Sequence, residues 1–369
     1  MSYQQDINAG LDRARGIAPV VPIELRDLRL AILSDLHRGA GDDADDFRAC
    51  KHTYAAAVAR YDRQHLILAI LGDTEDLWEC WPIEVVTEYA ASIALEKPFL
   101  DAGRYWRLLG NHDEAWQRSV LVDLYLRPLL GPVEPIESLR LLVMDKGRAL
   151  GEIFLVHGHQ GVAWEERLAW FSRRMLRYSW RPIQRLANLK TTTPATDWRL
   201  GRKHERAIYR WAVSKEGLIV IAGHTHHPAF PSPARYDQLA AIYDDLRHQP
   251  EAYDPEVAER METDLAFARA QEQPCYFNTG CCSFSDGSLT GIEIAGGVIR
   301  LVRWSGPKGR ARREVLATAR LKDVLRDVGP PREPAPYGWP LELGIRSVSR
   351  FPGSKVRRKA SGGGAPLPL

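Results

Sequence analysis

Two short polar stretches, GNHDE at residues 110–114 and GHTHH at residues 223–227, decide the fold of this sequence. Each follows a largely apolar run directly, YWRLL (105–109) before the first and LIVIA (218–222) before the second. Short apolar runs of this kind are typical of buried strands. Imidazole, amide and hydroxyl groups therefore stand at the ends of two predicted strands that are more than one hundred residues apart in the chain.

Polar side chains follow three further apolar runs in the same way. The runs are LRLAILS, HLILAILG and EIFLV, and the residues after them are Asp35 with His37, Asp73, and His157 with His159. In an open α/β sheet, ligands bind beyond the carboxyl ends of the strands. We therefore expect the five strand ends to bring their polar groups together at one edge.

Helical segments alternate with these strands, as at residues 47–61 and 83–97. Because each strand is apolar throughout, the pattern predicts an α/β protein whose sheet is covered on both faces. The domains expected along the chain are a lead-in (1–25), a main domain (26–305), a C-terminal extension (306–354) and a Gly/Pro-rich, disordered tail (355–369). Within the main domain we expect a helical lid at about 163–212, a second helical insertion at about 232–272, and β-hairpin strands over 275–304.

Composition narrows the class of protein further. With 369 residues, 45% of them hydrophobic, the chain can bury a sizeable core, and its net charge of +3 is too small to indicate a nucleic-acid or membrane partner by itself. Five widely spaced cysteines argue against a secreted disulfide framework. We see no signal peptide and no apolar run long enough for a transmembrane segment. The expected location is cytoplasmic, and the oligomeric state stays open.

The polar residues at the strand ends form a set of candidate metal ligands. Seven side chains belong to it, and they are Asp35, His37, Asp73, Asn111, His157, His224 and His226. Oxygen and imidazole ligands without thiolates suit Mn²⁺, Fe or Zn²⁺. Seven are too many for one ion, but they fit two ions about 3.5–4 Å apart with one shared carboxylate. A water bridging such ions is deprotonated near neutral pH, so this set predicts two-metal phosphoester hydrolysis.

The same residues carry a resemblance to a known family. The blocks DLH (35–37), GDTED (72–76), GNHD (110–113), VHGH (156–159) and GHTH (223–226) occur in the order found in the calcineurin-like metallophosphoesterases, and NTG (278–280) is also similar. This resemblance implies a four-layer αββα sandwich with helical insertions. It also implies two divalent metal ions, of which Mn²⁺ is expected first and Fe or Zn²⁺ are alternatives.

The resemblance further implies a role for each site residue. One ion would be bound by Asp35, His37, Asp73 and His226, and the second by Asp73, Asn111, His157 and His224. His112 would not bind metal, but would face the phosphate, stabilise the charge of the transition state and protonate the leaving oxygen. Asp76 and Asp113 would orient the ligands or the imidazole. The expected catalytic residues are therefore His112, Asp76 and Asp113.

The first insertion bears on the substrate. Residues 165–210 hold twelve Lys or Arg against four acids, and five tryptophans lie in or beside them. Guanidinium groups suit phosphate and indole faces suit bases, sugars or acyl chains. We expect this segment to lie over the metals. The alternative is a solvated helix that packs its tryptophans on the core. The expected substrate contacts are His159, Arg173, Arg174 and Arg177.

Several substrates fit this description. The expected function is hydrolysis of a phosphomonoester, a phosphodiester or a pyrophosphate bond, small or lipid-linked. GDTEDLWE (72–79) resembles the UDP-2,3-diacylglucosamine pyrophosphatases, although those commonly have Arg after the Asn where this chain has His112. A nuclease that stacks bases on the basic, tryptophan-rich insertion is a second possibility. A binding protein on the same fold is a third, but the complete ligand set argues against it.

Overall fold

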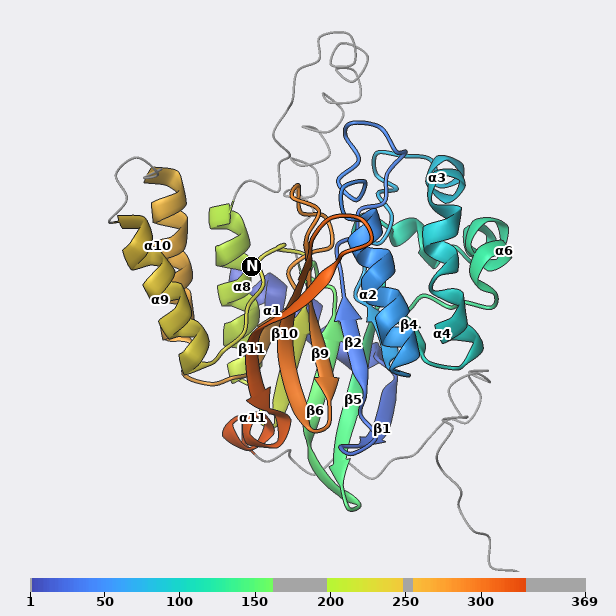
Figure 1. The fold of residues 1–369 in the computed structure, drawn as a ribbon. Helices are drawn as coiled ribbons and strands as arrows, with labels where there is room; N and C mark the ends of the chain where they lie inside the picture. The colour runs from blue at the N-terminus through green and yellow to red at the C-terminus, as the bar shows by residue number, and fades with distance from the viewer. Residues whose placement is uncertain (1, 162–197, 248–254, 330–369) are drawn as a thin grey trace, which may run out of the picture. The chain divides into compact units, whose positions relative to one another are not determined.

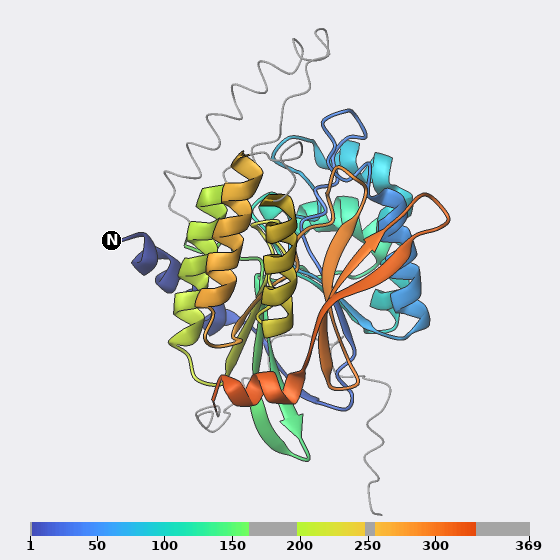
Figure 2. The ribbon, with the colours of Figure 1, turned by 60° about the vertical axis from the view of Figure 1, so that its left-hand side comes forward.

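The structure is a computed structural model that describes residues 2–161, 198–247 and 255–329. All of these residues belong to one compact unit. Two β-sheets lie between layers of helices, as Figures 1 and 2 show from two directions. This arrangement is the predicted four-layer αββα sandwich.

The six-stranded sheet carries three of the predicted ligand strands. Its order is β11-β10-β9-β2-β3-β4, and β2, β3 and β4 run parallel to one another, with Leu30 beside Ile67 and Leu68 beside Tyr105. The strands are β2 (Leu30–Leu33), β3 (Ile67–Ile70), β4 (Tyr105–Arg107), β9 (Leu289–Ala295), β10 (Val298–Ser305) and β11 (Arg312–Arg320). On this side of the sandwich lie α2 (Lys51–Arg63), α3 (Pro82–Ala94), α4 (Lys97–Asp101) and α6 (Arg127–Leu130).

The five-stranded sheet carries the other two ligand strands. Its order is β1-β5-β6-β7-β8, in which β6, β7 and β8 are parallel and β5 is antiparallel to β6. The strands are β1 (Val20–Glu24), β5 (Ser138–Asp145), β6 (Arg148–Val156), β7 (Leu218–Ala222) and β8 (Tyr276–Asn278). Helix α1 (Tyr3–Ile17) packs on β5, and helix α8 (Trp198–Val213) packs on β7 and β8.

The five predicted ligand strands are all present, but they are divided between two sheets instead of forming one. In β2, β3 and β7 every residue is buried. A strand of the sandwich has helices on one face and the second sheet on the other, so it is as apolar throughout as a strand in a single covered sheet. The strand pattern therefore could not distinguish the two arrangements.

Other segments add elements around this sandwich. The segments 232–247 and 255–272 contain α9 (Pro233–Arg247) and α10 (Pro255–Ala270), and β11 of the expected extension pairs with β10. The remaining elements are α11 (Leu321–Asp327), the 3₁₀ helix η1 (Glu114–Gln117), α5 (Ser119–Leu121) and the π-helix η2 (Val122–Leu126). Residues 162–197, with Arg173, Arg174 and Arg177, and the tail 355–369 lie outside the described residues.

Two further expectations concern the chain as a whole. Each of the five cysteines is buried and has a free thiol, in agreement with the absence of a disulfide framework. Across the described ranges, no helix combines the length and the apolar character that crossing a membrane requires.

A buried charge cluster lies between α2, β4 and the loop after β3. Its members, Arg38, Glu75, Glu96 and Arg107, are 2% exposed or less. Arg38 pairs with both glutamates and so does Arg107. Burial raises the pKa of Glu96, but the two guanidinium groups outweigh it and hold that pKa below its ordinary value. Glu96 is therefore ionised between the two guanidinium groups, and each member of the cluster depends on the others for its compensation.

Arg107→Met should destabilise the protein by about 3–5 kcal/mol, because it leaves two buried carboxylates with only Arg38 between them. The free energy of unfolding from urea titrations measures this loss. Arg48→Met is the control, since it breaks only the exposed pair with Asp43 and should cost less than about 1 kcal/mol. Equal losses in the two variants would contradict the assigned role of the buried charge cluster.

Candidate metal centre

The loops that follow β2 and β3 are held together by their own backbones. The amide of Asp35 donates to the carbonyl of Gly72 at 3.1 Å, and that of His37 donates to the carbonyl of Asp73 at 2.9 Å. In return, the amide of Asp76 donates to the carbonyl of Arg38 at 2.9 Å. The first two polar blocks therefore form one hydrogen-bonded unit beyond the strands.

The backbone of this region is strained at the predicted ligands. Seven non-glycine residues of the described chain have positive φ, and five of them are Asp35, His37, Asp73, His224 and His226. Their φ angles lie between 49° and 69°, in the left-handed region that such residues seldom adopt. Strained residues of this kind persist only where the surrounding structure holds them, and they cluster at functional sites.

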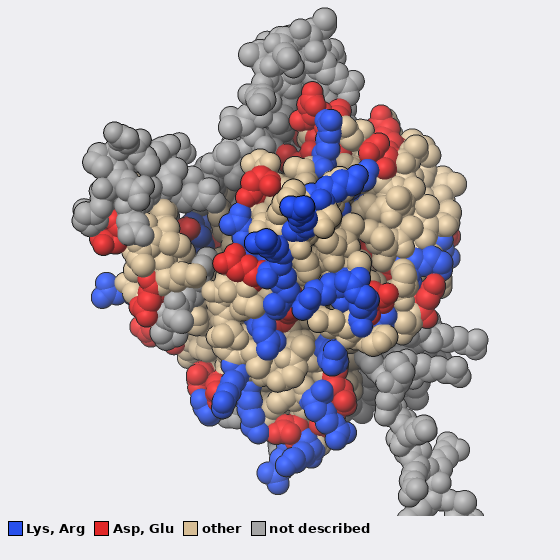
Figure 3. Space-filling view, viewed as in Figure 1, with Lys and Arg blue, Asp and Glu red and all other residues tan. Residues whose placement is uncertain are grey.

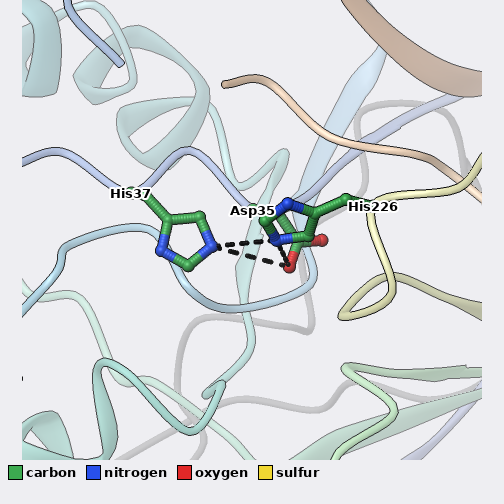
Figure 4. A group of neighbouring side chains, drawn as sticks. All are labelled: Asp35, His37 and His226. Atoms are coloured by element: carbon green, nitrogen blue, oxygen red, sulfur yellow. Dashed lines mark hydrogen bonds and ion pairs between the residues drawn. The ribbon is translucent and has the colours of Figure 1, made fainter. Parts of the chain in front are cut away.

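The first group of ligand atoms joins Asp35, His37 and His226 (Figure 4). The Nε2 atoms of His37 and His226 lie 3.1 Å apart, and Nε2 of His226 lies 3.3 Å from Oδ1 of Asp35. Asp35 is oriented by the amide of His224, which donates to both carboxylate oxygens, and by the hydroxyl of Ser34. Two imidazole nitrogens and a carboxylate thus converge on one point.

The second group joins Asp73, His157 and His224. Nε2 of His157 lies 3.1 Å from Oδ2 of Asp73 and 3.2 Å from Oδ1 of Asn111. The other ring nitrogen, Nδ1, lies 2.8 Å from the carbonyl oxygen of Leu71, a distance at which Nδ1 donates a hydrogen bond to it. That hydrogen bond leaves Nε2 free to act as a ligand.

Asp73 stands between the two groups. Its Oδ2 is also 3.8 Å from Nε2 of His37, which belongs to the first group, while its Oδ1 accepts a 2.8 Å hydrogen bond from the amide of His112. The carboxylate of Asp73 therefore lies within 4 Å of an imidazole in each group, His37 in the first and His157 in the second. This is the position that a bridging carboxylate requires.

Glycines leave room for these carboxylates. A methyl group on Gly110 would collide with Oδ1 and the backbone nitrogen of Asp73. On Gly223 it would lie 2.5 Å from Oδ2 of Asp35. The glycines of GNHD and GHTH are therefore required by close approach and not by φ.

His112 lies beside the ligands with its ring held on several sides. Its Nδ1 is 3.1 Å from Oδ1 of Asp76, and its Nε2 is 4.0 Å from Oδ2 of Asp73. The indole of Trp78 stacks on the imidazole. Burial lowers the pKa of His112, but the carboxylates of Asp73 and Asp76 outweigh this effect and raise it to about 9. His112 is therefore an imidazolium that can donate a proton from Nε2.

Asp113 connects the third block to the second. Its Oδ1 accepts from the amide of Gly110 at 2.7 Å, and its Oδ2 accepts from the amide of Thr74 at 2.9 Å. The side chain is fully buried. Its two hydrogen bonds join the loop that carries Asn111 to the loop that carries Asp73.

The chemistry of the donor set fits divalent metal ions. Burial, with the nearby His112, lowers the pKa of His37 to about 3, so this imidazole is neutral and has a lone pair to give. Burial raises the pKa of Asp73, but His157 and His112 outweigh it and hold that pKa well below its ordinary value. Burial lowers the pKa of His157, but the carboxylate of Asp73 outweighs this effect and raises it to about 9, so this imidazole must give up its proton when an ion binds. Imidazole nitrogens and ionised carboxylates that lie, within each group, within 4.8 Å of one another are what a metal centre needs.

The predicted substrate contact His159 lies at the side of the second group. Its ring centroid is 5.3 Å from that of His157, and its Nε2 is 3.8 Å from Oε1 of Glu114. The sequence analysis did not predict a function for Glu114. The arginines predicted to accompany His159 lie outside the described residues.

The sequence did not predict two residues that hold the ligand loops in place. The side-chain amide of Asn278 donates to the carbonyl of Gly223 at 2.7 Å and so fixes the GHTH loop. His204 of α8 contacts the carbonyl of Gly158 and the hydroxyl of Tyr3, and its ring centroid is 5.3 Å from that of His224. The NTG block was a signal for Asn278, whereas nothing in the sequence marks His204.

Comparison with known proteins identifies the family of the chain. A model of the calcineurin-like phosphoesterase family matches residues 28–228, more than half of the chain. The chain belongs to the calcineurin-like phosphoesterase family. Among solved structures it is similar to vacuolar protein sorting 29 from Cryptosporidium parvum, at 12% identity and a TM-score of 0.32 over 79% of this chain and 97% of that one. No curated protein matches the sequence.

Membership of the calcineurin-like phosphoesterase family confirms the predicted fold and makes the chain a metal-dependent phosphoesterase. The finer resemblance to UDP-2,3-diacylglucosamine pyrophosphatases gains no support from these matches and stays a prediction. The identity of the metal likewise stays open.

Gly110→Ala should abolish tight metal binding, because the added methyl group displaces the carboxylate of Asp73. Gly16→Ala adds the same group at a position with no atom within 4 Å and is the matched control. Calorimetric titration of metal-stripped protein with Mn²⁺ measures both. We expect the affinity of Gly110→Ala for Mn²⁺ to fall by about 100-fold or more, because loss of a residue that merely supports a ligand already costs about 10–100-fold. Wild-type affinity in this variant would show that Asp73 is not a ligand.

Proposed function

We propose that the protein hydrolyses a phosphoester or pyrophosphate bond at a dinuclear metal centre. The observation that carries this proposal is the position of Asp73 between two separate groups of ligand atoms. In the proposed assignment, the first ion is held by Asp35, His37, Asp73 and His226. The second is held by Asp73, Asn111, His157 and His224.

Bound at these positions, two divalent ions would activate the attacking water and neutralise charge on the phosphoryl oxygens. The protein's own groups supply the other requirements. The hydrogen bonds to Asp35, Asp73 and His157 hold the ligands in one orientation before substrate arrives. Such preorganisation lowers the barrier because little rearrangement is left for the reaction itself.

His112 is the proposed proton donor. As the bond between phosphorus and the leaving oxygen breaks, the leaving oxygen keeps the electron pair of that bond and takes the proton from Nε2 of His112. The attacking water forms the new bond to phosphorus and loses one proton to the solvent. A proton from the solvent then returns to the imidazole, so one water molecule is consumed in each cycle. Asp76 holds Nδ1 and favours the charged ring, and Asp113 keeps the adjoining loops in register.

The described part of the chain gives little support to a nuclease. Figure 3 shows Lys and Arg side chains gathered on the face where α2, β10 and β11 lie, but Arg303 and Arg313 there pair with Asp286 and Glu293. In the described end of the first insertion, Arg202 is buried between Glu205 and Asp264. We therefore propose a small or lipid-linked phosphoester or diphosphate as the substrate, with the lipid-linked diphosphate as its more specific form.

A tryptophan beside the first insertion is buried and is not available to stack on a substrate. Trp211, counted among the tryptophans available for stacking, is 1% exposed and donates to Oδ1 of Asp12 at 3.0 Å. It packs beside Phe154 of β6. This tryptophan therefore belongs to the core between α8 and the five-stranded sheet, as in the alternative that the sequence left open.

Asp73→Asn and His112→Asn should each lower hydrolysis of p-nitrophenyl phosphate or bis-p-nitrophenyl phosphate by about 10²–10⁴-fold, the usual contribution of a proton donor or a charged group at the reacting centre. The assay uses metal-stripped protein with Mn²⁺ added back. His52→Asn is the control, because His52 is exposed on α2 and should leave turnover unchanged.

The ester that is turned over faster separates monoesterase from diesterase activity. Absence of turnover with both esters, despite two bound ions per chain, would direct the search to lipid-linked diphosphates. Full activity of both variants would rule out the proposed mechanism. Protein that binds no ion under any condition would rule out the metal centre itself.

A further inference from the structure

Trp78 lies flat on the imidazole of His112. The ring centroids are 4.5 Å apart, and the planes differ by 17°. Trp78 is half-buried, whereas Leu77 packs against the hydrophobic core and Cys80 of the same loop belongs to it. The contact of the indole that bears on the site is its stack on His112.

The same short turn carries Trp78 and Asp76. The amides of Glu79 and Cys80 donate to the carbonyl of Asp76 at 3.3 Å and 3.0 Å, so residues 76–80 form a closed turn after the GDTED block. That turn presents a carboxylate to Nδ1 of His112 and an indole to the face of its ring. Two neighbouring side chains thus control two different features of one imidazole.

A hydrogen bond at Nδ1 does not by itself fix an imidazole. It fixes the position of one atom, but the ring can still tilt about that contact and carry Nε2 out of line. A flat indole against the ring face prevents the tilt, and the ring of His37 packs at 87° to the imidazole with centroids 4.5 Å apart. With these contacts, Nε2 is held toward Asp73, 4.0 Å from its Oδ2.

We propose that Trp78 is a positioning residue whose indole fixes the ring plane of His112, so that Nε2 points toward the proposed metal centre, where the leaving oxygen of a phosphoester would lie. The inference rests on the proposed function of His112 as proton donor. It assigns to Trp78 no contact with metal or substrate. Its effect on the reaction passes through His112 alone.

The test is a double-mutant cycle with two esters. Trp78→Leu should lower kcat on phenyl phosphate by about tenfold, less than the 10²-fold that a displacement of 1 Å can cost. The loss on p-nitrophenyl phosphate should be smaller, because its better leaving group depends less on a proton. KM and the number of bound Mn²⁺ ions should not change. Trp78→Phe, which keeps a flat ring, should recover most of the rate.

In the His112→Asn background, Trp78→Leu should have no further effect, because the side chain that it positions is gone. An equal loss of kcat in that background would show that Trp78 acts on the fold and would overturn the proposal. So would an equal loss on the two esters, or an unchanged kcat in Trp78→Leu.

A measurement independent of activity separates this inference from the proposed function. The Hε1 proton of His112, identified by its absence from the spectrum of His112→Asn, should resonate upfield because the indole stacks on the ring. Trp78→Leu should move it downfield in histidine-labelled protein. An unmoved signal would overturn the stacking, whereas a moved signal in a protein without phosphoesterase activity would leave the contact standing and refute only the proposed reaction.

Discussion

The site depends on the carboxylate of Asp73 being ionised and buried at the same time. Burial disfavours the charge, and the imidazoles of His157 and His112 compensate for it. The backbone amide of His112 gives it a hydrogen bond, and Gly110 leaves the space that the carboxylate needs. The left-handed backbone of Asp73 itself turns the side chain toward both groups of ligands. These contacts join the GDTED block to the GNHD and VHGH blocks, which is why the three blocks must meet in space.

The buried charge cluster lies directly behind these loops. Arg38 follows His37 and Glu75 follows Asp73 by two residues, so the pairs formed by Arg38 and Glu75 anchor the loops from the side that faces the core. The indole of Trp116 donates to Glu75 at 2.9 Å, and the hydroxyl of Tyr54 donates to Glu96 at 2.7 Å. These two bonds connect the glutamates of the cluster to residues of the surrounding core, in addition to their pairs with the arginines.

The ligand strands could be predicted because apolar runs that end in polar residues are local features, and the resemblance to the family carried by those residues implied the four-layer sandwich. The strand pattern by itself did not show that the strands divide between two sheets, since β2 and β7 are equally apolar in either arrangement. Supporting residues were missed for a related reason. His204 and Glu96 act through contacts with residues far away in the chain, and neither is preceded by a recognisable pattern. Trp78 stood within a quoted block, yet its stacking on His112 depends on how two loops meet.

The two sheets contribute unequally to the site, and each group of ligands takes members from both. Asp35, His37, Asp73 and Asn111 follow strands of the six-stranded sheet, whereas His157, His224 and His226 follow strands of the five-stranded sheet. An ion in either group would therefore be a cross-link between the two halves of the sandwich. Because such an ion binds the folded chain and not the unfolded one, it would add to the stability of the whole protein by mass action. The proposed metal centre would then also stabilise the contact between the two sheets at that end.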